Sequence, residues 1–181
     1  NAGPGYGGSC FPKDTLALME TARGYKAPIE IIEATVRVNG ARKQKMAQKI
    51  IEALDGNVKG KTIAILGLTF KPNTDDMRDA PALDIVPTLQ AEGAKVRAFD
   101  PEGMHEAKGM LKDVQFATGP YDCVQNADAV VIITEWDQFR AHHLDRMKYA
   151  LKTPMVVDLR NIYRPEEMRA KGFKYVSVGR P

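Results

Sequence analysis

Hydrophobic positions follow a helical period in the first third of the chain, and strand-like and helix-like patterns alternate after it. Residues 12–23 predict a short helix, with Leu16, Met19 and Ala22 near one face and Gly24 as its stop. Residues 28–54 predict a long helix, because apolar positions recur there in alternating steps of three and four. At 1.5 Å per residue, this second helix would be roughly 40 Å long.

The long helix has one continuous stripe and an unusually apolar first half. The stripe consists of Ile29, Ile32, Val36, Asn39, Lys43, Met46, Ile50 and Leu54. Two interpretations stay open. The helix is either buried in the core of its own chain, or it is a connecting rod that packs against a second copy and forms a homodimer through a self-complementary patch.

After residue 59 the pattern alternates between strands and helices. Strands are expected at 62–68, 96–99, 114–116, 129–134, 155–158 and 175–178, and helices at 81–90, 104–112, 121–126, 145–151 and 165–171. The apolar runs at 62–68 and 129–134 are typical of strands buried on both faces. This alternation predicts an α/β fold in which the long helix precedes a doubly wound, Rossmann-like parallel sheet.

Composition excludes several classes of function. Of 181 residues, 44% are hydrophobic, and the net charge of +3 is spread without a basic block, which argues against nucleic-acid binding. No apolar run approaches the roughly 18 residues of a membrane span. The two cysteines, Cys10 and Cys123, and three histidines show no metal-ligand spacing, so we expect no metal, a structural Cys123 and a reducing cytoplasm. The chain lacks an initiator methionine, and we expect a fragment of a longer protein.

A glycine-rich stretch carries the first candidate chemistry. Residues 3–14 read GPGYGGSCFPKD and place Cys10 just before the expected helix, with Pro12 suited to its first position. A cysteine beside a helix N-terminus faces the positive end of the macrodipole, which favours the thiolate, and Lys13 adds a positive charge. The glycines let bare N–H groups approach an anion. These residues alone leave open a reactive thiol beside an anion site or a turn with a buried cysteine.

The loops that follow the expected strands are the second candidate region, because ligands of doubly wound sheets bind beyond the carboxyl ends of the strands. Loop 69–79 lacks the G-x-G-x-x-G fingerprint but carries Lys71 and Arg78, whose charges suit a phosphate or a carboxylate. A solvated turn neutralised by its own aspartates is an equal alternative. Arg160 is expected near the same rim. Asp100 could hold a ribose, but a capping or turn role is favoured.

Several of these motifs resemble one enzyme family. Residues 3–14 resemble the catalytic-cysteine signature of the NAD-dependent nucleotide-sugar dehydrogenases, the family of UDP-glucose and GDP-mannose 6-dehydrogenases. Residues 28–39 are similar to the central helix through which these enzymes dimerise. Residues 66–81 look like the opening of their C-terminal domain, and residues 134–136 and 157–160 match later segments. The sequence of residues 69–76, TFKPNTDD, resembles the UDP-sugar members more than the GDP-mannose members.

The resemblance implies roles for individual residues. Cys10 would be the nucleophile, and Asp14, one helical turn later, would position or activate water. Substrate contacts are expected from the opening loop and two strand ends: Gly3, Pro4, Gly5, Tyr6, Gly7, Phe70, Lys71 and Arg160. Contacts to NAD are expected from Cys10, Phe11, Pro12, Lys13 and Arg78.

The implied reaction is the double oxidation of UDP-glucose to UDP-glucuronate by two NAD+, through a thiohemiacetal and a thioester on Cys10. Residues 1–58 would hold the cysteine loop and the dimerisation helices, and residues 59–181 the UDP-sugar domain. The family's N-terminal NAD-binding domain is absent from this sequence, so we expect a homodimeric fragment that is inactive alone. Alternatives are a UDP-N-acetyl-hexosamine or GDP-mannose dehydrogenase fragment, and a non-catalytic binding and dimerisation module. A cysteine hydrolase ranks last, because no histidine lies near Cys10.

Overall fold

The computed structural model describes residues 3–141 and 143–180 of the chain. The helices are α1 (Cys10–Gly24), α2 (Glu30–Ala53), α3 (Ala82–Ala91), α4 (Met104–Met110), α5 (Pro120–Val124), α6 (Asp137–Arg140), α7 (Leu144–Ala150) and α8 (Pro165–Ala170). The strands are β1 (Thr62–Leu66), β2 (Lys95–Phe99), β3 (Val114–Phe116), β4 (Ala129–Ile132), β5 (Met155–Asp158) and β6 (Lys174–Ser177).

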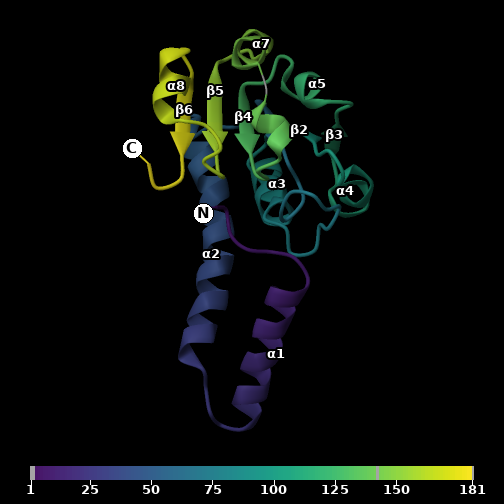
Figure 1. The fold of residues 1–181 in the computed structure, drawn as a ribbon, viewed down its shortest axis with the longest axis vertical. Coiled ribbons are helices and arrows are strands. Elements are labelled where there is room, and N and C mark those ends of the chain that lie inside the picture. Colours follow the sequence, from purple (N-terminus) through teal and green to yellow (C-terminus); the bar gives the residue numbers. More distant parts are fainter. Residues whose placement is uncertain (1–2, 142, 181) are drawn as a thin grey trace.

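Helices α1 and α2 form a hairpin that projects from one end of the sheet (Figure 1). Helix α1 buries Pro12, Thr15, Met19 and Ala22, which recur every three or four residues on the face toward α2. The 24 residues of α2 span about 36 Å. The helix begins two residues later than expected, at Glu30, because the backbone of Ile29 is not helical (φ −109°, ψ 83°).

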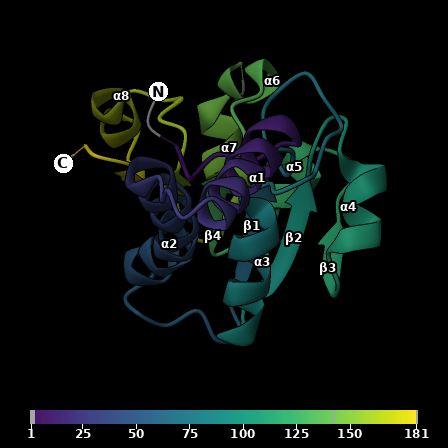
Figure 2. The same ribbon diagram turned by 90° about the horizontal axis from the view of Figure 1, so that it is seen from below.

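The six strands form one parallel sheet with the order β3-β2-β1-β4-β5-β6, which confirms the predicted doubly wound architecture. The strand order reverses between β1 and β4, which pair from Ile63–Ala129 to Leu66–Ile132. In Figure 1 the strand arrows point toward the α1–α2 hairpin, so the carboxyl ends of the strands face the glycine-rich loop. Seen from below, α4 and β3 lie at one edge of the molecule and α8 at the other (Figure 2).

Alternate residues of the central strands pack into different cores on the two faces of the sheet. In β1, Ile63 and Ile65 pack with the second half of α2 and with α3, whereas Ala64 and Leu66 pack with α5, α6, α7 and α8. All four of these side chains are fully buried. The expectation of strands buried on both faces is therefore confirmed.

Three details differ from the expectations. Helix α1 begins at Cys10, so Pro12 is its third residue rather than its first, and Cys10 lies inside the first turn. Strand β1 ends at Leu66 because Gly67 adopts φ +89° with Thr134 directly against it. The four-residue helix α6 was not expected, because it is too short to show a hydrophobic period.

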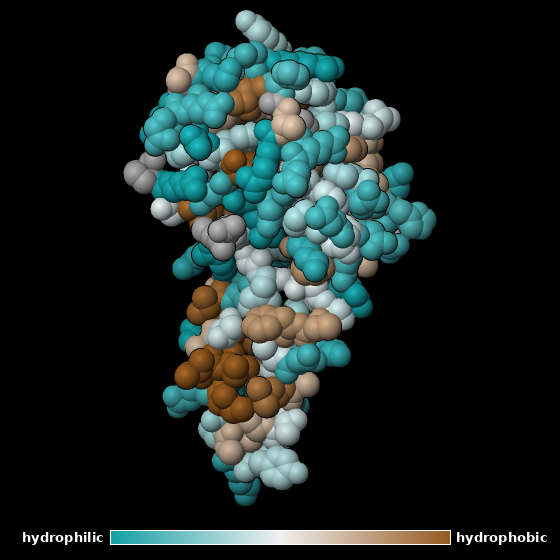
Figure 3. Space-filling model, viewed as in Figure 1, coloured by the Kyte–Doolittle hydropathy of each residue, from teal (hydrophilic) through white to brown (hydrophobic). Residues whose placement is uncertain are grey.

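The two halves of the long helix differ in burial, so the core interpretation holds for its second half, and packing against a second copy stays a prediction. Its second half is buried, with Ala47 and Ile50 fully enclosed, whereas Ile31 and Val38 in its first half are 79% and 55% exposed. Figure 3 shows apolar side chains gathered over the α1–α2 hairpin, in contrast to the largely polar surface around the sheet. Among the described residues, no helix combines the length and apolarity that a bilayer crossing requires.

Candidate functional site

The loop of residues 3–8 lies between α2 and the segment that follows β1. On the α2 side, Asn39 makes two hydrogen bonds to the backbone of Tyr6, and Arg42 Nε donates to the Gly3 carbonyl at 2.5 Å. On the other side, the Gly8 N–H donates to the carbonyl of Arg78 at 2.7 Å. The loop is thus fixed by parts of the chain that are distant in sequence.

Close approach explains two of the glycines in this loop. A Cβ on Gly7 would clash with the carbonyl of Asp79. A Cβ on Gly8 would lie 2.8 Å from the ring of Phe70, and the φ of +87° at Gly8 also favours glycine. The glycines were expected to let the backbone approach an anion, and that stays a prediction; at Gly7 and Gly8 the close neighbour is the chain itself.

The loop forms one wall of a groove of about 820 Å³. Gly3, Gly5, Tyr6 and Gly7 line it from the loop, and Phe70 and Arg160 line it from the carboxyl ends of the strands. Helix α2 supplies the third wall through Ile31, Ala34, Thr35, Val38, Asn39 and Arg42. Six of the eight predicted substrate contacts therefore meet in one groove, and a volume of this size suits a small organic ligand. Pro4 is buried next to the groove without lining it.

Cys10 is exposed and free, and it is the first residue of α1. The ring of Phe11, the next residue, packs edge-on against Tyr6 with the centroids 4.7 Å apart. This contact connects the groove wall to the first turn of α1. Cys123, by contrast, is fully buried, and burial raises the pKa of its thiol to about 12. The reading of Cys123 as structural agrees with this position.

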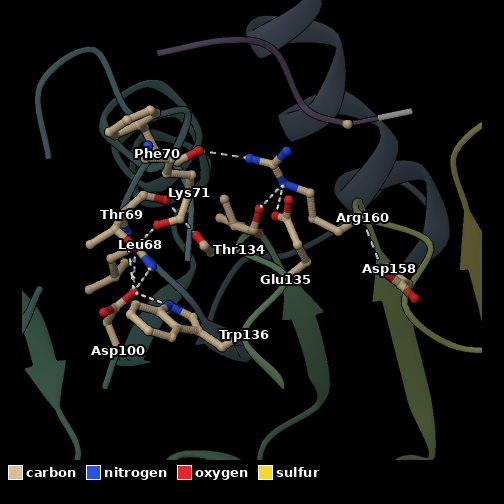
Figure 4. A network of polar contacts seen from close by, with 12 residues as sticks. Leu68, Thr69, Phe70, Lys71, Asp100, Thr134, Glu135, Trp136, Asp158 and Arg160 are labelled. Atoms are coloured by element: carbon tan, nitrogen blue, oxygen red, sulfur yellow. Dashed lines mark hydrogen bonds and ion pairs between the residues drawn. The ribbon is translucent and has the colours of Figure 1, made fainter. Parts of the chain in front are cut away.

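Arg160 crosses between three strand ends (Figure 4). Its Nε donates to the carbonyl of Ile133 at 2.7 Å and lies 3.0 Å from Glu135 Oε2, while Nη2 donates to the carbonyl of Phe70 at 3.0 Å. Burial lowers the pKa of Arg160, and the Glu135 carboxylate opposes that shift. With these donors engaged by the chain, Nη1 is the end of the guanidinium left for a ligand, and it points toward Gly3.

Asp100 holds the start of the loop that carries Phe70 (Figure 4). Its carboxylate is fully buried, and Oδ2 accepts hydrogen bonds from the Leu68 N–H at 2.7 Å, the Thr69 N–H at 3.2 Å and Trp136 Nε1 at 3.1 Å. A carboxylate so enclosed is not available to a ribose. The favoured capping role is correct, and the ribose alternative is wrong.

The remaining predicted residues do not line the groove, and all of them lie on the surface except Pro12, which is buried in α1. Asp14 is exposed and pairs with the equally exposed Lys13 at 3.4 Å. Lys71 is exposed, with its ammonium 5.3 Å from the Phe70 ring centre. Arg78 is exposed, and the carboxylate of Asp76, with smaller contributions from Cys10 and Asp75, raises the pKa of Arg78. The guanidinium of Arg78 meets both carboxylate oxygens of Asp76, as the neutralised-turn alternative expects, while its side chain stays exposed.

Two groups of residues around the groove were missed at the sequence level. Asn39 and Arg42 bind the backbone of the loop, Lys43 binds the carbonyl of Asp79, and Glu135 faces Arg160. Polar residues inside an otherwise apolar helical stripe were the available signal for Asn39 and Lys43. Among the described residues, no group of histidine, cysteine, aspartate or glutamate side chains could hold a metal ion.

Comparison with known proteins gives the context for this arrangement. Residues 64–165 match the UDP binding domain of the UDP-glucose/GDP-mannose dehydrogenase family, and residues 1–41 match the central domain of that family. UDP-glucose 6-dehydrogenase from Rhizobium meliloti is 55% identical over 181 residues, which cover 100% of this chain and 41% of that protein. UDP-glucose 6-dehydrogenase TuaD from Bacillus subtilis is 45% identical over 99% of this chain and 39% of its own length.

A solved structure agrees with these matches. The UDP-glucose dehydrogenase of the hyperthermophilic archaeon Pyrobaculum islandicum superimposes with a TM-score of 0.81 and 32% identity, over 96% of this chain and 38% of that one. The chain thus spans about 40% of the length of these relatives. The parallel sheet, the cysteine loop and the family match over more than half of its residues lead to one conclusion: this chain belongs to the UDP-glucose/GDP-mannose dehydrogenase family.

Proposed function

We propose that this chain supplies the cysteine nucleophile and part of the UDP-sugar site of an NAD-dependent UDP-glucose 6-dehydrogenase, which oxidises UDP-glucose to UDP-glucuronate. The observation that carries the proposal is the groove in which the glycine loop, Phe70 and Arg160 meet, with Cys10 exposed at the end of the same loop. The names and identity levels of the matched relatives favour UDP-glucose as the substrate.

The groove fits a nucleotide sugar in its chemistry. Arg160 offers a charged donor for an anionic group, and Phe70 and Tyr6 offer ring faces beside the backbone of the glycines. Lys71, exposed next to Phe70, would reach the outer end of a long ligand. Pro4 would act by keeping the loop in place, because it is buried behind the groove.

The proposed chemistry at Cys10 is covalent. Its thiolate would add to the C6 aldehyde of the sugar to give a thiohemiacetal. The thioester formed by the second oxidation would be hydrolysed by water to the carboxylate, which returns the thiol. Asp14 lies one helical turn after Cys10 with an exposed carboxylate, so it could orient that water from the same face of α1.

NAD+ would supply the hydride acceptor for both oxidations when it is bound. The residues present fit one side of a dinucleotide: Arg78 and Lys13 are exposed cations near Cys10, and charges of this sign suit a pyrophosphate. We assign this side to Cys10, Phe11, Pro12, Lys13 and Arg78. The described loop after β1 contains no G-x-G-x-x-G turn, so we expect this chain alone to be inactive.

Two further properties belong to the proposal. The exposed apolar side chains of α2, above all Ile31 and Val38, would pack against a second copy of the chain, so we expect a homodimer through residues 28–54. Division into residues 1–58 and 59–181 remains a prediction. Both cysteines are free thiols, which fits a reducing cytoplasm.

The test combines binding with protection of the thiol. We expect calorimetry to detect UDP-glucose binding, and saturating UDP-glucose to slow alkylation of Cys10 by iodoacetamide. Tighter binding of a UDP-N-acetyl-hexosamine or of GDP-mannose would replace the substrate assignment. UDP-glucose binding with a Cys10 that is inert to iodoacetamide would favour a non-catalytic binding and dimerisation module. Robust NADH formation by this chain alone would refute the expected inactivity.

A further inference from the structure

Asn39 of α2 binds the backbone of Tyr6 in a reciprocal way. The Tyr6 N–H donates to Asn39 Oδ1 at 2.8 Å, and Asn39 Nδ2 donates to the Tyr6 carbonyl at 3.1 Å. One side-chain amide thus satisfies both backbone groups of a residue that lies 33 positions earlier. Because residues 3–7 form neither a helix nor a strand, their backbone groups depend on partners of this kind.

The neighbouring residues of α2 reinforce this contact without duplicating it. Arg42 donates to the Gly3 carbonyl, and Lys43 donates to the Asp79 carbonyl at 3.0 Å. These side chains follow Asn39 by three and four positions and therefore share its face of the helix. Arg42 binds the start of the glycine loop at Gly3, and Lys43 binds the segment before α3 at Asp79. Asn39 binds the centre of the glycine loop at Tyr6.

Tyr6 connects Asn39 with both the groove and the nucleophile. Its side chain lines the groove and packs at 87° against the ring of Phe11, which directly follows Cys10. Asn39 itself lines the groove on the α2 side. A displacement of Tyr6 would therefore alter the groove wall and release the ring contact beside the thiol.

We propose that Asn39 is a positioning residue, which fixes the backbone of Tyr6 and so holds the glycine loop as a wall of the sugar-nucleotide groove with Cys10 beside it. An amide is required because it offers one donor and one acceptor in the geometry of the Tyr6 backbone. Aspartate keeps the acceptor but places a second oxygen against the Tyr6 carbonyl, and leucine offers neither. The effect of Asn39 on substrate binding rests on the proposed function, whereas its contact with the loop does not.

The test measures amide hydrogen exchange in the chain with Asn39→Asp and Asn39→Leu. Losing a hydrogen bond of ordinary strength should speed exchange of the Tyr6 N–H about tenfold in Asn39→Leu, with a smaller effect in Asn39→Asp. Gln48→Leu is the matched control, because Gln48 is an exposed polar residue of α2 away from the loop. Exchange of the amides of β1 reports whether the fold is intact, and Asn39→Asp serves if Asn39→Leu does not fold.

Binding provides the second readout. UDP-glucose should bind about tenfold more weakly to both Asn39 variants than to the wild-type chain and the Gln48→Leu control. Unchanged Tyr6 exchange in a folded Asn39 variant would overturn the contact, and unchanged UDP-glucose affinity would overturn the positioning role. If the wild-type chain binds no UDP-glucose, the proposed function fails, while the exchange experiment still decides whether Asn39 holds the loop.

Discussion

Replacing Asp100 by asparagine tests how the loop that carries Phe70 is held. The carboxylate of Asp100 is fully buried, and each of its oxygens accepts at least two hydrogen bonds. Oδ1 accepts from the backbone N–H groups of Glu102 and Gly103 at 3.0 and 2.8 Å. Oδ2 accepts from two further backbone N–H groups and from the indole of Trp136.

The stability lost in Asp100→Asn follows from the number of hydrogen-bond donors that the Asp100 carboxylate satisfies. An asparagine must put its NH₂ group where one of the two oxygens was, so at least two N–H groups lose their acceptor, and at least one of them is buried whichever way the amide turns. Each unsatisfied buried donor costs about 1–3 kcal/mol, so Asp100→Asn should lose about 1–6 kcal/mol, depending on which oxygen is replaced. That is a large share of the roughly 5–15 kcal/mol by which domains are usually stable.

Equilibrium unfolding in urea measures this loss. Trp136 is the only tryptophan in the sequence and donates to Asp100, so its fluorescence reports the site, and circular dichroism reports the helices. Asp113→Asn is the matched control: Asp113 is exposed at φ +54°, a conformation that asparagine tolerates, and we expect a change within about 0.5 kcal/mol. If Asp100→Asn lowered the free energy of unfolding by less than about 1 kcal/mol, with its slope against urea concentration unchanged, the donor count would be refuted.

Three further predictions concern the loop and its surroundings. Iodoacetamide should modify only Cys10 in the folded chain, detected by mass spectrometry, because Cys123 is buried with a pKa of about 12; modification of both thiols before unfolding would contradict this. The hydrogen bond from Arg78 lowers the pKa of Asp76, so this pair stabilises the fold above about pH 4 and the contribution disappears as the pH falls through the lowered pKa; Arg78→Gln should raise that pKa in an NMR titration. Gly7→Ala should weaken UDP-glucose binding at least about tenfold in calorimetry, since a Cβ there meets a backbone carbonyl, whereas alanine at the glycine that ends α1 should not.

The sheet was predictable because each central strand shows its burial in its own short run of sequence. Runs such as 63–66 and 129–132 are apolar at every position, and burial on both faces requires that composition. The strand ends were less certain, because Gly67 leaves the sheet through a left-handed backbone that depends on Thr134, a residue far away in the sequence. Helix α6 could not be predicted, since four residues make a single turn and carry no period.

The groove was predictable only in part. Cys10, Phe70 and Arg160 were found through motifs, but motifs give no information on how a side chain is used. Arg160 was expected to contact substrate, and the structure adds that its Nε and Nη2 donate to the carbonyls of Ile133 and Phe70. Asn39 was counted as one position of a helical stripe, because its partner Tyr6 lies 33 residues earlier and no period reveals a contact of that range.

These contacts make the position of the glycine loop beside Cys10 depend on two separate parts of the chain. Lys43 is only 7% exposed; it joins α2 to the loop before α3 through the carbonyl of Asp79, and to α3 itself through an ion pair of 3.2 Å with Asp84. In the same helix, Ile50 is fully buried in the core that β1 and α3 share. The α2 helix is therefore anchored to the sheet at one end and presents Asn39 to the glycine loop one turn before Lys43. Because the helix is continuous, the position of Tyr6 relative to Arg160 is set by the packing of α2 on the sheet rather than by the loop itself.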